Sequence, residues 1–195
     1  MDLHSLSDSD KAYLLKLARR TLQERFGILS SETLPPPSEL LQQPAATFVT
    51  LTIKGELRGC VGTLEAYQPL VEDVKEHVIA AAFHDFRFPP VSKEELPLIE
   101  IEISVLTKPE RLNYNNPQEL PKLLKPFEDG VVLAWGGRRA TFLPQVWHKI
   151  PDTEKFLDHL CLKMGVNPQL WRREILEVWI YQVIEFREGE ILKTG

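Results

Sequence analysis

The chain has 195 residues, of which 43% are hydrophobic and 26% are charged, a composition typical of a globular protein and not of a disordered one. A chain of this length forms one domain, or one core with a smaller lobe, and needs no disulfide or structural metal to be stable. The formal net charge is −5 and no long basic run is present, which argues against nucleic acid as a partner.

The number of cysteines and the lack of targeting signals in the sequence indicate the cellular compartment. The two cysteines lack metal-site spacing, and a small secreted scaffold would contain more of them. The polar, acidic start of the chain lacks the apolar region of a signal peptide, and no stretch approaches the roughly 20 apolar residues of a membrane span. We therefore expect a cytoplasmic protein with no membrane partner.

The first predicted element is an amphipathic helix over residues 8–26, in which an apolar residue recurs every fourth position and Gly27 follows as a stop. Residues 28–45 contain three consecutive prolines, which cannot donate hydrogen bonds to a sheet. This segment is therefore predicted to be an extended surface arm.

A hairpin and a second helix follow. Residues 46–53 alternate between apolar and polar side chains, and Lys54-Gly55 predicts a turn into a second strand. Pro69 suits the first turn of a helix with an apolar stripe. Because Pro89-Pro90 cannot continue a helix, we expect it to end near Phe88.

The remaining elements are predicted in the same way, from alternation, caps and turn residues. In order they are a strand at 98–106, a turn-rich stretch at 107–128 with a short helix around 118–124, a hairpin of strands at 131–135 and 139–142, a helix capped by Asp152 and closed by Gly165, a short helix at 168–173 and a long final strand at 175–186. This order predicts an α+β fold with a mixed, largely antiparallel sheet flanked by helices. No dinucleotide-binding or phosphate-binding glycine loop is present.

The segment 57–63 is the strongest candidate for chemistry. Cys60 lies between glycines, and Arg58 is expected to share a strand face with it and to lower the pKa of its thiol. Glycines in a strand indicate a bulge or a close approach to the backbone, and a tight turn would point the amides from Gly59 to Thr63 at an anion. The alternative is that Cys60 is an ordinary core residue.

Two further positions are candidates. At the end of the second helix, His84 offers a base and Arg87 a cation, but basic residues are also favoured at helix ends, and Asp85 is a natural partner for Arg87. Glu102 lies on the polar face of the strand at 98–106, which is usually solvated, and it becomes a general base if it borders a cleft. No metal-binding motif is present, and the four tryptophans are expected in the core.

The run Leu57-Arg58-Gly59-Cys60-Val61-Gly62 resembles the hallmark of the AMMECR domain family. Further blocks similar to those of the family follow in the expected order, within residues 10–187: Ala81-Ala82 with Asp85, Arg87-Phe88 and Pro90; residues 102–106; Gly130 with residues 141–147; and Phe156-Leu157 with Cys161 and Lys163. The resemblance implies one domain over residues 1–195, with a two-lobed α+β fold and a cleft between the lobes. It also implies a cytosolic protein similar to the A component of a three-part microbial system with a Memo-type protein and a radical S-adenosylmethionine protein. The family has no settled activity, so any cofactor stays open.

Two hypotheses about function follow. In the first, the chain is an enzyme or enzyme component that uses nucleophilic or redox chemistry at Cys60, with Glu102 or His84 moving protons. Its substrate or an anion would be bound by Arg58, Gly59, Gly62, Thr63 and Arg87. In the second, the chain is a non-catalytic adaptor whose rigid turn presents backbone amides to one of those partner proteins.

Overall fold

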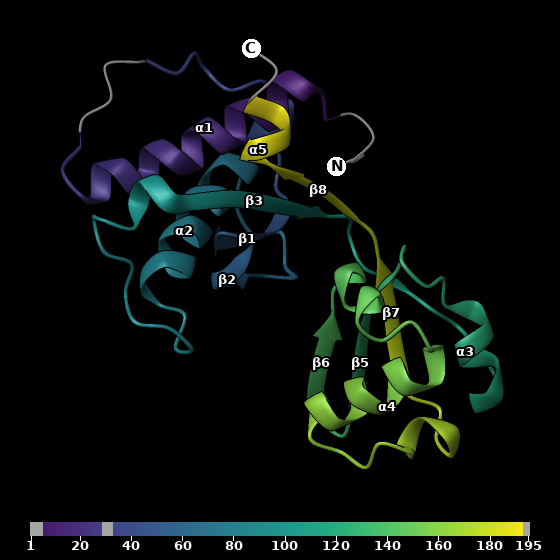
Figure 1. Ribbon diagram of the computed structural model, residues 1–195. Helices are drawn as coiled ribbons and strands as arrows, with labels where there is room; N and C mark the ends of the chain where they lie inside the picture. Colours follow the sequence, from purple (N-terminus) through teal and green to yellow (C-terminus); the bar gives the residue numbers. More distant parts are fainter. Residues whose placement is uncertain (1–5, 29–32, 193–195) are drawn as a thin grey trace. The chain divides into compact units, whose positions relative to one another are not determined.

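The computed structural model describes residues 6–28 and 33–192. The chain divides into two compact units, unit 1 with residues 1–108 and 184–195 and unit 2 with residues 109–183, whose elements are labelled in Figure 1. The predicted α+β class is confirmed. However, the strands form two four-stranded sheets where the sequence pattern predicted one, because alternation identifies a strand but not its partners.

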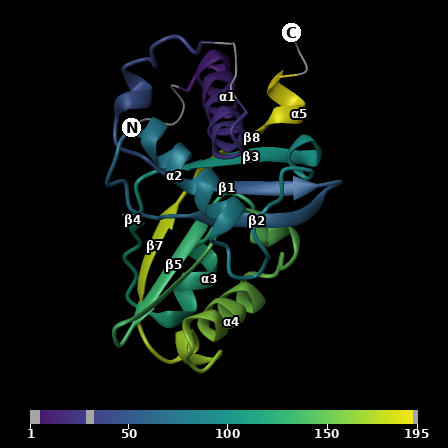
Figure 2. The same cartoon turned by 90° about the vertical axis from the view of Figure 1, so that its left-hand side faces the viewer.

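Unit 1 contains a sheet in the order β2-β1-β3-β8. Its elements are α1 (Asp8–Arg25), β1 (Ala46–Ile53), β2 (Glu56–Gly62), α2 (Leu70–Phe83), β3 (Ile99–Leu106), β8 (Val183–Arg187) and α5 (Glu188–Ile191), with short 3₁₀ turns at Leu40–Gln42 and Leu96–Leu98. β1 lies between β2 and β3 in both views (Figures 1 and 2) and pairs antiparallel with each.

The core of unit 1 lies between its sheet and the helices α1 and α2. Both predicted apolar stripes are buried there, as are the alternating residues of the two central strands: Leu14, Ala18 and Leu22; Leu70, Val74, Val78, Ala81 and Ala82; Val49 and Leu51; Ile101, Ile103 and Val105. Because one face of β1 and β3 is buried against helices, their intervening residues share the opposite face. That opposite face contains the candidate site.

The local signals for α1 and the hairpin are confirmed. Ser7 caps α1 by accepting a hydrogen bond from the amide of Asp10, and Gly27 follows the helix with φ at 71°. Lys54 and Gly55 both have positive φ, at 53° and 82°, as a two-residue hairpin turn requires. The register of the strand that contains Cys60 is set by this turn.

Unit 2 contains a sheet in the order β4-β7-β5-β6, in which neighbouring strands pair antiparallel. Its elements are β4 (Glu110–Arg111), α3 (Leu120–Leu123), β5 (Gly130–Trp135), β6 (Arg138–Phe142), α4 (Thr153–Met164) and β7 (Glu177–Tyr181), with 3₁₀ turns at Pro117–Glu119, Pro144–His148 and Leu170–Arg172. Trp147 stacks on Phe156 in the core, with ring centroids 3.6 Å apart. Trp135 is 37% exposed at the end of β5, so its predicted core position is wrong.

Two predicted elements differ from the structure in their boundaries, and two short elements were missed. α2 ends at Phe83 instead of near Phe88, because the chain turns at Asp85, whose carbonyl accepts a hydrogen bond from the amide of Phe88. The predicted final strand is divided at Gln182 into β7 and β8, which belong to different sheets. The short elements β4 and α5 were not predicted.

Parts of two predictions lie outside the described residues: positions 1–5 of the polar N-terminus and 29–32 of the proline-containing arm. Within the described ranges, no helix is both long enough and apolar enough to cross a membrane. The expected cytoplasmic location stays a prediction.

Candidate functional site

The glycines of β2 allow unusually close contacts with the backbone. A Cβ at Gly59 would clash with the carbonyl oxygen of Ala81 in α2, and a Cβ at Gly62 would clash with the carbonyl oxygen of Thr47 in β1. These clashes involve backbone atoms, which cannot rotate away. The close approach predicted for these glycines is therefore confirmed, and it fixes β2 against both α2 and β1.

β2 also contains the predicted bulge. Leu51 of β1 pairs with Gly59 and Thr52 pairs with Leu57, which leaves Arg58 as the extra residue. A bulge re-aims the side chain of the inserted residue. The sequence pattern predicted that Arg58 and Cys60 share one face of the strand. Because of the bulge, they do not.

Arg58 is engaged in a contact away from the thiol. Its Nε and Nη2 donate to the two carboxylate oxygens of Glu95 at 2.7 and 3.0 Å, and its guanidinium also donates to the carbonyl oxygens of Pro89 and Pro90. The hydrogen bonds from Arg58 lower the pKa of Glu95 below its ordinary value. The predicted action of Arg58 on the Cys60 thiol is therefore wrong, and the role of this residue in the structure is to hold the bulge.

Asp85 and Arg87 hold the backbone of Cys60. The amide of Cys60 donates to Oδ2 of Asp85 at 2.9 Å, and Nη2 of Arg87 donates to the carbonyl oxygen of Cys60 at 3.1 Å. The same guanidinium binds both oxygens of Asp85, at 2.9 Å from Nε and 2.7 Å from Nη2, so the predicted pairing of these two residues is confirmed. The hydrogen bonds from Arg87 hold the pKa of the buried Asp85 carboxyl far below its usual range.

The thiol of Cys60 is half-buried and accepts a hydrogen bond from Oγ1 of Thr50 at 3.2 Å. Burial raises the pKa of this thiol above its ordinary value, although the Thr50 hydroxyl and the charge of Arg87 act in the opposite direction. The charges of Asp85 and Glu102 also raise it. The predicted lowering of the Cys60 pKa is therefore wrong, because burial outweighs the nearby cation.

Cys60, Thr50 and Glu102 form a row across three neighbouring strands. Thr50 of β1 lies directly opposite Cys60 of β2 and directly opposite Glu102 of β3. Residues directly opposite in adjacent strands point to the same face of a sheet. The row therefore lies on the sheet face opposite α1 and α2, with Thr50 between Cys60 and Glu102.

Glu102 belongs to a cluster with Glu185 and Arg187 of β8. One nitrogen of Arg187, Nη2, lies 3.1 Å from a carboxylate oxygen of Glu102 and 3.1 Å from one of Glu185. Burial, the charge of Glu185 and a hydrogen bond with its side chain raise the pKa of Glu102 to about 7, while Arg187 acts to lower it. Near neutral pH the carboxyl of Glu102 is therefore partly protonated beside one guanidinium.

The predicted anion nest does not form. Residues 59–62 belong to an extended strand, in which successive amides point in opposite directions and cannot converge on one anion. The amide of Cys60 is bound to Asp85, and the amide of Thr63 donates to the carbonyl oxygen of Thr47 at 3.0 Å. Gly59, Gly62 and Thr63 therefore do not bind an anion through convergent amides.

His84 caps the end of α2 and is exposed to solvent. Its backbone amide donates to the carbonyl oxygen of Ala80, and its ring makes no hydrogen bond to any residue that the structure describes.

Of the residues predicted to converge, Cys60, Glu102 and Arg87 are brought together, whereas Arg58 and His84 are not.

Thr50, Glu185 and Arg187 were missed as site residues. Each is an unremarkable residue in an alternating strand, and only the strand order and register place it beside Cys60 or Glu102. The structure also shows no group of three or more His, Cys, Asp or Glu residues suited to a metal ion within residues 6–28 and 33–192.

Fold and site together define a two-unit α+β protein with a cysteine on the edge strand of the first sheet, held there by an aspartate–arginine pair. The AMMECR1 family model matches residues 15–186, and the chain belongs to this family. It is 37% identical to a protein of Thermofilum pendens over 201 residues, covering 94% of this chain and 92% of the relative. It is 38% identical to a protein of Methanothermobacter thermautotrophicus over 191 residues, covering 94% and 96%.

A crystal structure shows the same fold. The uncharacterized protein PH0010 from Pyrococcus horikoshii superposes with a TM-score of 0.81 at 33% sequence identity, covering 93% of this chain and 92% of that one. The resemblance stated from the sequence is therefore confirmed at the level of family and fold.

Proposed function

We propose that the chain is an enzyme, or the enzymatic component of an assembly, that transfers an acyl group through Cys60. One observation carries this proposal: the row in which Cys60, Thr50 and Glu102 lie opposite one another on a single sheet face. The row supplies a nucleophile, a hydroxyl that can both accept and donate a proton, and a carboxylate base.

The electrostatics of the row fit a base-assisted mechanism. Because burial raises the pKa of the Cys60 thiol, the sulfur is largely protonated at neutral pH and needs a base to become a nucleophile. The pKa of Glu102 is about 7, so a substantial fraction of it is ionised there. A general base is most effective when its pKa lies near the working pH.

The proposed reaction has two steps. In the first, the Thr50 hydroxyl, which donates to the sulfur in the structure, reorients to accept the thiol proton and passes its own proton to Glu102, and the sulfur electron pair forms a bond to the acyl carbon of the substrate. The leaving group departs with the electrons of its bond to that carbon and takes the proton from Glu102. In the second, Glu102 takes a proton from water, and the resulting hydroxide attacks the thioester. The acid product leaves as the C–S bond breaks, the sulfur keeps the electrons of that bond, and Glu102 returns its proton to the sulfur through Thr50.

Arg87 is suited to bind an anionic group on the substrate. Its Nε and Nη2 are engaged by Asp85 and by the carbonyl oxygen of Cys60, whereas Nη1 makes no hydrogen bond within the described part of the chain. Nη1 has two N–H groups and lies on a side chain that is 45% exposed. The proposed substrate is therefore an acyl compound with a carboxylate or phosphate near the reacting carbon.

Transient acylation by p-nitrophenyl acetate tests this proposal. We expect acetylation of Cys60, located by peptide mass spectrometry, and no adduct at the fully buried Cys161. Cys60→Ser should abolish the adduct, and Glu102→Gln should slow its formation about a hundredfold. The exposed Glu56→Gln on the same strand as Cys60 serves as the matched control and should react like the unmodified protein. Acetylation that is independent of Glu102 would exclude the proposed base.

A second candidate function is that of an adaptor, and Phe86 favours it. This side chain is 97% exposed, yet its neighbours Asp85 and Arg87 are fixed to the backbone of Cys60. An exposed aromatic residue on a rigid loop is suited to be the anchor of a protein interface. The Memo-type and radical S-adenosylmethionine proteins implied by the family resemblance are the first partners to test.

Calorimetric titration of such a partner separates the two functions. If the loop is a docking element, Phe86→Ser should weaken binding at least about tenfold and leave the acylation of Cys60 unchanged. Tyr67→Ser, at a residue that is 57% exposed, is the matched control. Unchanged affinity of Phe86→Ser for a partner that binds the unmodified chain would rule out docking through this loop.

A further inference from the structure

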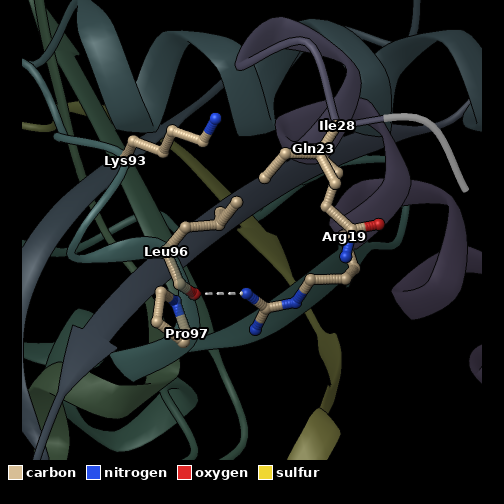
Figure 3. Close-up of a pocket in the computed structure, with 6 residues that line it drawn as sticks. All are labelled: Arg19, Gln23, Ile28, Lys93, Leu96 and Pro97. Atoms are coloured by element: carbon tan, nitrogen blue, oxygen red, sulfur yellow. Dashed lines mark hydrogen bonds between the residues drawn. The ribbon is translucent and has the colours of Figure 1, made fainter.

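Unit 1 contains a cavity that shares no residue with the Cys60 row. Its volume is about 470 Å³, within the range of about 300–1,000 Å³ typical of small-molecule sites. Figure 3 shows its lining, which comes from α1, from the residue that follows Gly27 and from the segment that enters β3: Arg19, Gln23, Ile28, Lys93, Leu96 and Pro97. The lining combines three apolar side chains with three polar ones.

Arg19 forms a rigid, charge-balanced wall of the cavity. Its Nε and Nη2 bind both oxygens of Glu188 in α5, and its guanidinium also donates to the carbonyl oxygens of Leu96 and Ile99 at 2.8 and 2.6 Å. These four hydrogen bonds leave one of its five N–H groups, on Nη1, for a ligand. The charge of Arg19 is neutralised by Glu188, so this wall offers a hydrogen-bond donor but no net charge.

Lys93 provides a second charge at the cavity. Its ammonium forms no ion pair or hydrogen bond within the described part of the chain, although its charge interacts with the exposed carboxylate of the adjacent Glu94. In Figure 3, Lys93 lies across the cavity from Arg19 and Gln23. Gln23 is half-buried, and its side-chain amide also makes no hydrogen bond to a described residue. Among the described residues, the cavity therefore has one cation without an ion-pair partner and several unused donors around an apolar floor.

We propose that this cavity binds a small organic monocarboxylate. The carboxylate would accept hydrogen bonds from the side-chain amide of Gln23 and the remaining N–H of Arg19, and the ammonium of Lys93 would attract it from the opposite side of the cavity. The apolar body of the ligand would pack on Ile28, Leu96 and Pro97, as in most small-molecule sites. Because Glu188 neutralises Arg19 and Lys93 is the cation left without an ion-pair partner among the described residues, a singly charged ligand matches the site better than a dianion does.

Titration of the isotope-labelled full-length chain with benzoate tests the site, because benzoate combines one carboxylate with a compact apolar ring. We expect saturable shifts of the backbone amide resonances of Gln23 and Leu96. Benzamide, which has nearly the same shape but no charge, should bind at least about tenfold more weakly, because charged hydrogen bonds contribute more to affinity than neutral ones.

Two substitutions make the test specific. Lys93→Met keeps the length of the side chain and removes its charge, and it should weaken benzoate binding about tenfold, whereas Lys75→Met, at an exposed lysine paired with Glu72, should not. Gln23→Leu should weaken binding about threefold and serves as the second variant. The proposal is overturned if benzoate and benzamide bind equally, if the two lysine variants behave alike, or if no resonance around the cavity shifts.

Discussion

The backbone amide of Cys60 donates a hydrogen bond to the carboxylate of Asp85 at 2.9 Å, and the guanidinium bound to that carboxylate donates back to the carbonyl oxygen of Cys60. β2 is an edge strand, and an edge strand normally leaves such backbone groups unpaired. Asp85 and Arg87 satisfy both groups of one residue with side chains. They thereby fix the position of the sulfur without contacting it through hydrogen bonds.

This arrangement predicts that Asp85 is important for stability. Asp85→Ala removes a buried carboxylate and leaves the amide of Cys60 and the guanidinium of Arg87 without their partner. We expect the free energy of unfolding to fall by about 3 kcal/mol, measured by urea denaturation. Asp8→Ala, at an exposed aspartate paired only with Lys11, should change it by less than about 0.5 kcal/mol. Similar losses in the two variants would contradict the proposed importance of the Asp85–Cys60 contact.

The close approach of β2 to α2 gives a second prediction. Gly59→Ala places a methyl group against the backbone carbonyl of Ala81, which no change of side-chain rotamer relieves. We expect a loss of about 3 kcal/mol in the free energy of unfolding, at the upper end of the usual effect of overpacking. Glu56→Ala, at an exposed position of the same strand, is the control. A Gly59→Ala protein as stable as this control would mean that β2 and α2 can separate without cost.

Much of the fold could be predicted because its signals are local. Gly27 ends α1, Lys54-Gly55 forms the hairpin turn, and Gly165 ends α4 with φ at 78°, each through a conformational preference of the residue itself. The division into two sheets could not be predicted in this way. Nothing local at Gln182 indicates that the strands on either side pair with different partners.

The site shows the same division. Cys60 and Glu102 stood out because of residue type and context, but their connection through Thr50 depends on register across three strands. The error about Arg58 has a physical cause as well. The bulge removes it from the alternation that was assumed, and Glu95 then binds its guanidinium. The sign of the Cys60 pKa shift is determined by burial. Burial depends on tertiary packing and could not be predicted from the local sequence.

The reactivity of the Cys60 thiol tests which residue acts on it, Thr50 or Arg58. Alkylation by iodoacetamide should show a midpoint above the ordinary cysteine pKa of about 8.5, because burial disfavours the thiolate. Thr50→Val removes the hydroxyl that donates to the sulfur and should move the midpoint up by about one pH unit. Arg58→Met should leave it unchanged, since its guanidinium is bound to Glu95. A downward shift for Thr50→Val, or a large upward shift for Arg58→Met, would contradict this assignment.

The raised pKa of Glu102 predicts how the free energy of unfolding depends on pH. Its pKa is about 7 in the folded chain and about 4.3 in an unfolded one, so between these values the folded state holds a proton that the unfolded state has released. The contribution of Glu102 is therefore most favourable below about pH 4.3 and is lost as the pH rises through 7. We expect the full loss to reach about 4 kcal/mol, of which about 2.5 kcal/mol falls between pH 5 and 8.

Denaturation of the unmodified protein and of Glu102→Gln between pH 5 and 8 measures this contribution. The amide does not titrate, so the difference in unfolding free energy between variant and unmodified protein should move in favour of the variant by about 2.5 kcal/mol as the pH rises. Glu185→Gln should reduce the effect, because the charge and the hydrogen bond of Glu185 both raise the Glu102 pKa. Glu56→Gln should leave the pH dependence unaltered. If the Glu102→Gln difference is constant across this range, Glu102 does not titrate there, and the base assigned to the Cys60 row must be sought elsewhere.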